Sequence, residues 1–402
     1  MGTKPRAREL GVPFYGNPGP HNAITDVPGV EVGCTTLIEG EGQVVQGVGP
    51  IRTGCTAILP RGHDARLRPI WAGLYALNGN GEMTGSYWIH DGGYFLSPIV
   101  ITNTHSVGMC HHATVGWMID HYATAYTSQH LWAMPVIAET YDGGTNDING
   151  RHVKEEHVRA ALDSAQSGPV AEGCTGGGTG MSCYGFKGGT GTASRTFLLG
   201  QGLGARTCTV GALVQANFGR RQDFVVRGVP VGTDPDVAAA HTAAAKDEDG
   251  DEDEDEGEDE KERGSIIVIL GTDAPLMPNQ LNRLARRAAL GIARTGSPGG
   301  NGSGDMFLAF STANAEGGIP TAELGASAAP VLQHEYMHDD MTDALYLAAV
   351  ESTEEAILNA VCAAESMSTV KPAGGTIHAL DHAALRDVLR KYGRLDEPTS
   401  KL

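Results

Sequence analysis

The chain has 402 residues, with 29 Lys and Arg against 48 Asp and Glu, and a formal net charge of -19. This excess of acid argues against a nucleic-acid binder, which presents a basic face to phosphate. The longest apolar runs, such as Ile266–Leu270, are far shorter than the ~20 residues of a membrane span, and no apolar segment follows the basic N-terminus. Seven cysteines, spread singly from Cys34 to Cys362, indicate reduced thiols. We therefore expect a globular cytoplasmic protein without a nucleic-acid or membrane partner.

Strand-like and helix-like patterns alternate along the chain. Runs rich in Val, Ile, Leu and Ala predict strands, and apolar residues at helical spacing predict helices. Such a mixture is typical of helices layered on buried sheets, in an α/β or α+β fold. In chain order the expected elements are strands at Cys55–Pro60 and Ser97–Thr102, a helix at His111–Tyr126, a strand at Pro135–Thr140, a helix at Val153–Ala165, strands at Thr209–Ala216, Asp223–Arg227 and Ser265–Leu270, a helix at Asn279–Ala293, a strand at Met306–Ser311, and helices at Met341–Ala364 and Asp381–Lys391.

One segment of the chain has low complexity. Residues 246–263 (KDEDGDEDEDEGEDEKER) hold 13 acidic residues against three basic ones. Like charges at that density repel one another and bury no apolar surface, so we predict a disordered insertion. A calcium site is the alternative, but the tract lacks the ligand spacing of an EF-hand loop.

The junction after this acidic tract is a candidate self-cleavage site. Gly264 precedes an apolar run, SIIVIL, that begins with Ser265. A serine in this place can attack the carbonyl group of a preceding glycine, and cleavage gives it a free α-amine with a pKa near ~7.7–8.0. Such an amine can act as the general base for its own hydroxyl group. Taken alone, the junction favours the simpler interpretation, a loop that enters a strand.

A second motif, HEYMH, has the form HExxH that zinc peptidases carry on a helix. There His334 and His338 would bind zinc and Glu335 would activate water, with Glu354 or Glu355 as an available third ligand. The motif precedes the predicted helix that begins near residue 341 instead of lying on it. Zinc therefore stays an alternative, and a chelator-sensitive activity would favour it.

Several long motifs resemble the L-aminopeptidase D-Ala-esterase/amidase family of DmpA-type hydrolases, which includes the β-aminopeptidases. The resemblance runs in the same order from about residue 20 to residue 370. The motifs are HNAITDVPGVEVG (His21–Gly33), AETYDGGTNDING (Ala138–Gly150), MSCYGFKGGTGTASR (Met181–Arg195), TVGALVQANFG (Thr209–Gly219), GSIIVILGTDAPLMPNQLNRLARRAALGIARTG (Gly264–Gly296) and NGSGDMFLAFSTAN (Asn301–Asn314).

The resemblance implies an α+β fold, an αββα sandwich of two β-sheets flanked by helices, like that of DmpA and ornithine acetyltransferase. It also implies a precursor that cleaves itself between Gly264 and Ser265. The products would be an α chain of residues 1–264, which includes the acidic tract, and a β chain of residues 265–402. Both would form one domain, and the units would assemble into a homotetramer. The implied activity is release of an N-terminal residue from small peptides, amides or esters without a cofactor, with L-α-, D- and β-amino acyl substrates all open.

The same resemblance assigns a nucleophile and its supporting groups. Ser265 matches the nucleophile, and Ser303 matches a serine that helps to orient and activate it. Asp305 stands where a β-aminopeptidase relative carries glutamate, so its carboxylate is one methylene shorter. Without the family motifs, Ser303 would be an ordinary turn residue.

Four further positions match the family's groups for stabilising the oxyanion, which are catalytic, and for binding the substrate. Asn217 and Tyr141 match the two donors that hold the oxyanion of a tetrahedral intermediate. Glu139 matches the carboxylate that pairs with the substrate's ammonium group, and Trp132 matches an aromatic wall of the side-chain pocket. Outside the motifs these would be a turn residue, two core aromatics and a solvated carboxylate.

A non-enzymatic role is the remaining alternative. In that case the family fold serves as a scaffold, and the acidic tract is a docking tail for a basic partner. This hypothesis predicts that Ser265→Ala leaves the biological role intact.

Overall fold

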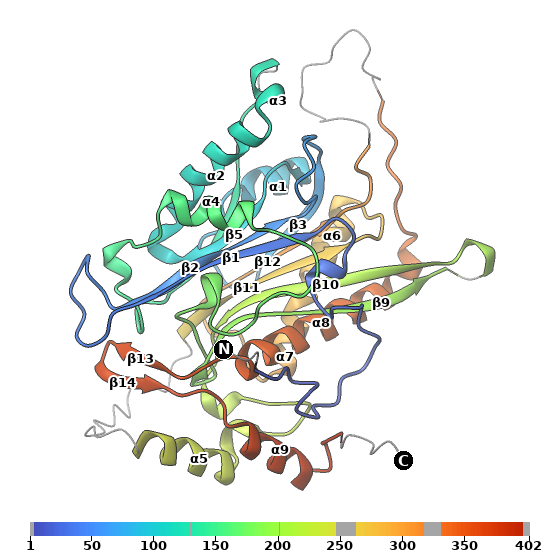
Figure 1. Cartoon of the computed structure of the whole chain (residues 1–402). Helices are drawn as coiled ribbons and strands as arrows, with labels where there is room; N and C mark the ends of the chain where they lie inside the picture. The colour runs from blue at the N-terminus through green and yellow to red at the C-terminus, as the bar shows by residue number, and fades with distance from the viewer. Residues whose placement is uncertain (1–3, 129–130, 201, 247–262, 317–330, 397–402) are drawn as a thin grey trace.

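Two β-sheets lie stacked between layers of helices in the computed structural model (Figure 1), which describes residues 4–128, 131–200, 202–246, 263–316 and 331–396. The four-stranded sheet has the order β1 (Glu31–Glu39), β2 (Ile51–Leu59), β5 (Ile99–Asn103), β6 (Val136–Thr140). The six-stranded sheet has the order β4 (Tyr94–Phe95), β3 (Ile70–Ala76), β12 (Gly302–Ser311), β11 (Arg263–Thr272), β10 (Arg206–Asn217), β9 (Gly189–Leu199). Two short pairs, β7 (Ser182–Cys183) with β8 (Phe186–Lys187) and β13 (Met367–Val370) with β14 (Ala373–Ile377), lie outside these sheets.

Helices cover the outer faces of both sheets (Figure 1). On the four-stranded sheet, α2 and α4 pack against apolar side chains such as Cys55 and Ile137. On the six-stranded sheet, α6, α7 and α8 bury a larger core. The helices are α1 (Ser86–Gly92), α2 (Val107–His121), α3 (Ala123–Ser128), α4 (Glu155–Asp163), α5 (Pro235–Lys246), α6 (Pro278–Ala285), α7 (Ala288–Arg294), α8 (Thr342–Cys362) and α9 (His382–Lys391). The predicted αββα sandwich is therefore confirmed.

Strand β11 lies in the middle of this arrangement because both of its faces are apolar. Ile266, Val268 and Leu270 belong to the core under the helices, whereas Ile267 and Ile269 belong to the core between the two sheets. Side chains alternate along a strand, so a continuous apolar run is what a strand buried on both faces requires. The run SIIVIL thus places the strand that begins near Ser265 in the interior.

A buried charge cluster ties β9 to α8. The Arg195 guanidinium is 1% exposed and lies 2.5 Å from Glu355 Oε2 and 3.4 Å from Glu351 Oε2. Arg8 adds a second ion pair to Glu355, at 2.6 Å. The close contact of strand and helix needs glycine at position 191, where a Cβ atom would lie 2.0 Å from the Ala356 carbonyl oxygen. Because a buried carboxylate without a partner is costly, these pairs hold the N-terminal segment and β9 against α8.

Most predicted elements are present, with one clear exception. Residues Asp223–Arg227 do not form a strand: a 3₁₀ turn covers Arg221–Asp223, and Val226 makes only an isolated bridge to Val229. Arg227 (φ 51°) and Gly228 (φ 84°) turn the chain back, and Val226 is buried from this loop. Two predicted helices, His111–Tyr126 and Asn279–Ala293, are each divided, into α2 with α3 and α6 with α7.

All seven cysteines are free, as the sequence predicted. Within the described ranges, no helix is both long and apolar enough to cross a bilayer. The predictions of a disordered insertion and of a calcium site fall on the acidic tract, whose residues 247–262 lie outside the described part of the chain.

Candidate active site

Ser265 lies near the start of β11, between the ends of two neighbouring strands. Its Cα pairs with that of Asn217 in the antiparallel neighbour β10 and with that of Gly304 in the parallel neighbour β12. Gly264 pairs with Ser303 in the same register. The sheet therefore brings together residues that lie as much as 87 positions apart in the sequence, from Asn217 to Gly304.

A cavity of about 770 Å³ opens at this end of the sheet. Four of the predicted site residues line it, as does Gly264, but Ser303 and Asp305 are buried next to it. The lining residues are Asn80, Gly81, Glu82, Thr104, Glu139, Tyr141, Gly144, Gly180, Ser182, Asn217, Gly264, Ser265, Gly302 and Ile377.

Trp132 is not brought into this cavity. Its side chain is 49% exposed and borders a separate small hollow with Trp88, Phe95 and Met134. Tyr141 does line the cavity and is about half exposed. The aromatic wall expected from Trp132 is therefore not part of the cavity within a single chain.

The Ser265 hydroxyl is held beside the peptide bond that precedes it. Its Oγ donates a hydrogen bond to the Gly264 carbonyl oxygen at 2.7 Å and accepts one from the Gly304 amide at 3.2 Å. Gly264 has φ 127°, and a Cβ atom there would lie 2.1 Å from the Asn217 carbonyl oxygen. Both the conformation and the space require glycine before the serine.

Ser303 and Asp305 form a buried hydrogen-bonded pair on β12. Ser303 Oγ donates to Asp305 Oδ1 at 2.5 Å, so the shorter aspartate reaches its serine directly. Because side chains alternate along a strand, these two share the helix-packed face of the sheet with Phe307. Ser265 faces the opposite side, towards the cavity, and Ser303 is the register partner of Gly264 on the neighbouring strand.

Backbone groups bind both polar atoms of the Asn217 side chain and so fix its orientation. Its Oδ1 accepts a hydrogen bond from the Ser182 amide at 2.9 Å, and its Nδ2 donates to the Tyr141 carbonyl oxygen at 3.0 Å. The β7–β8 hairpin that carries Ser182 is fixed by Lys187, whose buried Nζ donates to the Met181 and Gly188 carbonyl oxygens at 2.7 and 3.0 Å. Since an amide nitrogen carries two hydrogens, the second can face a substrate oxygen in the cavity.

Glu139 presents a buried carboxylate to the same cavity. It is 4% exposed, near the end of β6. Its Oε1 accepts from the Glu82 amide at 3.0 Å, and its Oε2 accepts from the Thr104 hydroxyl. Burial raises the pKa of Glu139, and the two hydrogen bonds oppose that shift only in part. A carboxylate held in this way is suited to bind a cation such as an ammonium group.

Sequence reasoning missed several residues that support these groups. Asn78 and Glu82 lie in a glycine-containing loop after β3, Thr104 follows β5, and Lys187 belongs to the short strand β8. The Asn-Gly pairs of the loop indicate a turn, but nothing local indicates which strand the turn contacts.

The HEYMH motif lies in an irregular segment and ends at a 3₁₀ turn, Asp339–Met341, before α8 begins at Thr342. His334 Nε2 is hydrogen-bonded to the Leu276 carbonyl oxygen at 2.9 Å, and His338 caps the turn by accepting from the Asp340 amide. The two histidines therefore do not share one face of a helix, which is the geometry that the zinc hypothesis requires. Among the residues that the structure describes, no three His, Cys, Asp or Glu side chains gather in a metal-binding group.

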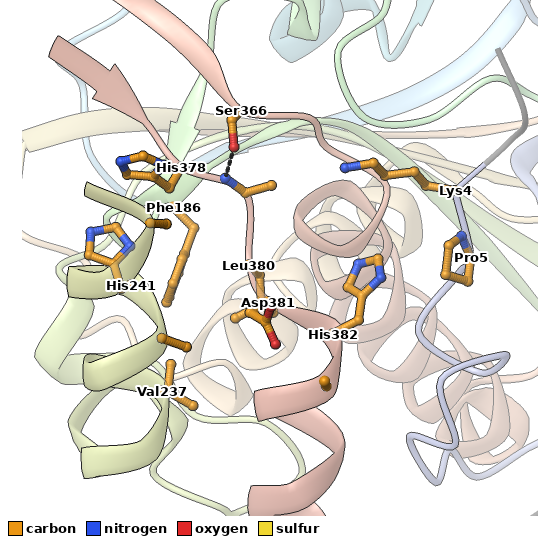
Figure 2. A pocket seen from close by; sticks show the side chains of 14 residues that line it. Lys4, Pro5, Phe186, Val237, His241, Ser366, His378, Leu380, Asp381 and His382 are labelled. Carbon is orange, nitrogen blue, oxygen red and sulfur yellow. Dashed lines mark hydrogen bonds between the residues drawn. The ribbon is translucent and has the colours of Figure 1, made fainter. Parts of the chain in front are cut away.

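A second cavity, of about 550 Å³, lies beside α5 and α9 (Figure 2). The rings of His241 and His378 meet there edge to face, with centroids 5.3 Å apart. Ser366 Oγ accepts a hydrogen bond from the Ala379 amide at 2.9 Å, and His382 Nε2 is bonded to the Cys362 carbonyl oxygen. Ser366 and His382 therefore bind local backbone groups, and none of the predicted site residues lines this cavity.

Comparisons with known proteins identify the family of the chain. The sequence profile of peptidase family S58 matches residues 22–373. The chain is 50% identical to the β-peptidyl aminopeptidase BapA of Sphingosinicella microcystinivorans, over 97% of this chain and 93% of that protein. It is 42% identical to the BapA of Sphingosinicella xenopeptidilytica, over 96% and 91%.

Solved structures give the same result. One match is the L-aminopeptidase D-Ala-esterase/amidase of Ochrobactrum anthropi, with a TM-score of 0.85 and 53% identity, over 98% of this chain and 100% of that one. That protein is described as a prototype of the serine aminopeptidases and a variant of the Ntn-hydrolase fold. A β-aminopeptidase from Burkholderia sp. matches with a TM-score of 0.82 and 44% identity, over 97% and 99%. The chain therefore belongs to peptidase family S58 and is an aminopeptidase with the N-terminal nucleophile hydrolase fold.

Proposed function

We propose that the chain is a self-processing precursor that cleaves between Gly264 and Ser265. Ser265 Oγ attacks the Gly264 carbonyl carbon, an O–C bond forms, and the C–N bond breaks to leave an ester and a free amine. Water then hydrolyses the ester, so the products are a carboxylate on Gly264 and an amine and hydroxyl on Ser265. The observation that carries the proposal is the Ser265 Oγ held 2.7 Å from the Gly264 carbonyl oxygen.

Cleavage converts the same serine into the catalytic nucleophile. Its Oγ attacks the substrate's carbonyl carbon, and its new α-amine takes the hydroxyl proton and returns it to the leaving amine. Asn217 and Tyr141 stabilise the charge that develops on the carbonyl oxygen. Water then releases the acyl group from Ser265. Ser303, which is bonded to Asp305, is the register partner of Gly264, next to the bond that cleavage opens, and this supports a role of the pair in orienting the α-amine.

The acidic lining of the cavity favours substrates with a free amino terminus. Glu139 and Glu82 are the carboxylates among the described lining residues. The substrate class is therefore an amino-acyl peptide, amide or ester bound through its ammonium group. Trp132, which is half exposed in a separate hollow, stays a prediction for the side-chain pocket.

We also propose that the cleaved units form a homotetramer in the cytoplasm. The family resemblance supports the assembly, and the free state of all seven cysteines supports a reducing compartment. Light scattering on the purified protein measures the mass of the assembly.

Replacing Glu139 by glutamine tests the ammonium site. A hydrogen bond to a charged group is worth about 1.5–3 kcal/mol, so we expect KM for an amino-acid p-nitroanilide to rise by about 10- to 100-fold, with little change in kcat. Because burial raises the pKa of Glu139, this carboxylate takes up its proton at a higher pH than an ordinary glutamate does. The wild-type KM should therefore rise as the pH falls through this raised pKa. This acid limb should be lost in Glu139→Gln.

The control for this variant is Glu155→Gln, a substitution at an exposed carboxylate on α4. An N-acetylated substrate should be inert with every form of the enzyme, because it carries no ammonium group. Unchanged KM in Glu139→Gln, or hydrolysis of the acetylated substrate, would contradict the assigned ammonium site. Loss of activity in a chelator would instead support the zinc hypothesis.

A further inference from the structure

A five-residue loop, Asn78–Glu82, contacts both the Glu139 carboxylate and the Asp305 carboxylate. At one end, the Glu82 amide donates to Glu139 Oε1 at 3.0 Å. At the other end, Asn78 follows β3 and lies next to the turn that leads into β12. We define residues 78–82 (NGNGE) as the bridging loop.

Asn78 makes two contacts through one side-chain nitrogen. Its Nδ2 donates to Asp305 Oδ2 at 3.1 Å and to the Gly300 carbonyl oxygen at 3.0 Å. The same Gly300 oxygen accepts the Ser303 amide at 3.0 Å. One amide group therefore holds both the Asp305 carboxylate and the turn that carries the Ser303 backbone.

These contacts determine how the Asp305 carboxylate meets its serine. Asp305 is 1% exposed, and its two oxygens have different partners, Ser303 on Oδ1 and Asn78 on Oδ2. With Oδ2 bound, the plane of the carboxylate is fixed and Oδ1 stays directed at the Ser303 hydroxyl. Asn78 does not line the cavity at Ser265, so it acts on the reaction only through these groups.

We propose that Asn78 is a positioning residue, which holds Asp305 and the Ser303 turn in the arrangement that serves the Ser265 amine. The inference rests on the proposed function, in which Ser265 is the nucleophile and the Ser303–Asp305 pair supports it. A group that sets the geometry of a proton-transfer site affects the chemical step more than substrate binding.

Two substitutions separate positioning from space filling. Asn78→Ala removes the donor, and we expect kcat to fall by about 10-fold or more while KM stays within about twofold. Asn78→Asp keeps the size of the side chain but turns an acceptor or a second negative charge towards Asp305. A positioning role therefore predicts a larger loss of kcat in Asn78→Asp than in Asn78→Ala, and a slower conversion of the precursor in both.

The matched control is Asn282→Ala, which removes an amide that donates to the Leu74 carbonyl oxygen of β3 at 2.7 Å, away from the cavity. Its kcat should match that of the wild type, and thermal unfolding of each variant gives a measure of folding. If Asn78→Asp is as active as the wild type, or if both Asn78 variants change only the unfolding temperature, the proposal is wrong. Ser265→Ala is measured alongside: turnover by that variant overturns the proposed function and this inference together, whereas an inactive Ser265→Ala beside active Asn78 variants overturns only the inference.

Discussion

Replacing Ser265 by alanine is expected to leave one uncleaved chain of 42.0 kDa and to lower kcat/KM by about 10⁴-fold or more. Both losses have one cause, because the same Oγ attacks the Gly264 carbonyl during processing and the substrate carbonyl during turnover. Cleavage is measured by intact mass under denaturing conditions, and turnover by release of p-nitroaniline from an amino-acid p-nitroanilide.

A surface serine provides the control for this change. Ser164, the exposed residue that follows α4, should tolerate alanine without effect on cleavage or turnover. Ser265→Cys keeps a nucleophile in the same place and should be cleaved, whereas alanine should not. A cleaved and active Ser265→Ala protein would show that another group performs both reactions.

Asn217→Ala is expected to lower kcat by about 10²- to 10³-fold, the usual cost of removing an oxyanion donor. The donor is Nδ2, which is held in place by the bond from the Ser182 amide to Oδ1. Self-cleavage should slow as well, because Asn217 and Ser265 are direct partners across β10 and β11 and the Gly264 oxygen carries the developing charge. Single-turnover measurements on the cleaved fraction separate the chemical step from binding.

Asn217→Asp distinguishes the donor from the shape of the side chain. Aspartate keeps an acceptor for the Ser182 amide but has no amide hydrogen to give to an oxyanion. Its kcat should therefore fall about as far as that of Asn217→Ala. A variant in which only KM changes would show that Asn217 binds the substrate and does not stabilise the transition state.

Part of the fold could be predicted from local sequence, and part came only through the family resemblance. The run Ile266–Leu270 indicates a strand buried on both faces, and the structure places β11 in the middle of its sheet. The stacking of two sheets depends on contacts between distant segments, such as β3 with β12, which periodicity does not encode. The αββα sandwich was therefore expected from the motifs and not from the pattern of apolar residues.

The errors and omissions have physical causes of the same kind. Residues 223–227 are rich in valine, but backbone with positive φ at Arg227 and Gly228 ends the run in a turn. Strand β9 begins with small residues, GTGTAS, because α8 packs closely on it, and small residues are weak strand signals. Asn78 was missed since its partner Asp305 lies 227 positions away.

The site, like the fold, could be predicted from the sequence only in part. The motifs located Ser265, Asn217 and Glu139, which all line one cavity. The family resemblance also suggested Trp132, which precedes the motif at Ala138–Gly150 and borders a different hollow in a single chain. The partners that orient the site come from short segments whose course only the fold determines, such as Thr104 after β5 and Ser182 in β7.

The most direct test of self-processing is the intact mass of the purified wild-type protein under denaturing conditions. We predict two chains, one ending at Gly264 and one beginning at Ser265, whose masses together equal the 42.0 kDa chain plus one water. After brief exposure to an ester substrate, the smaller chain alone should carry the acyl group. A single stable chain of 42.0 kDa in an active preparation would contradict the assignment of Ser265 as an N-terminal nucleophile.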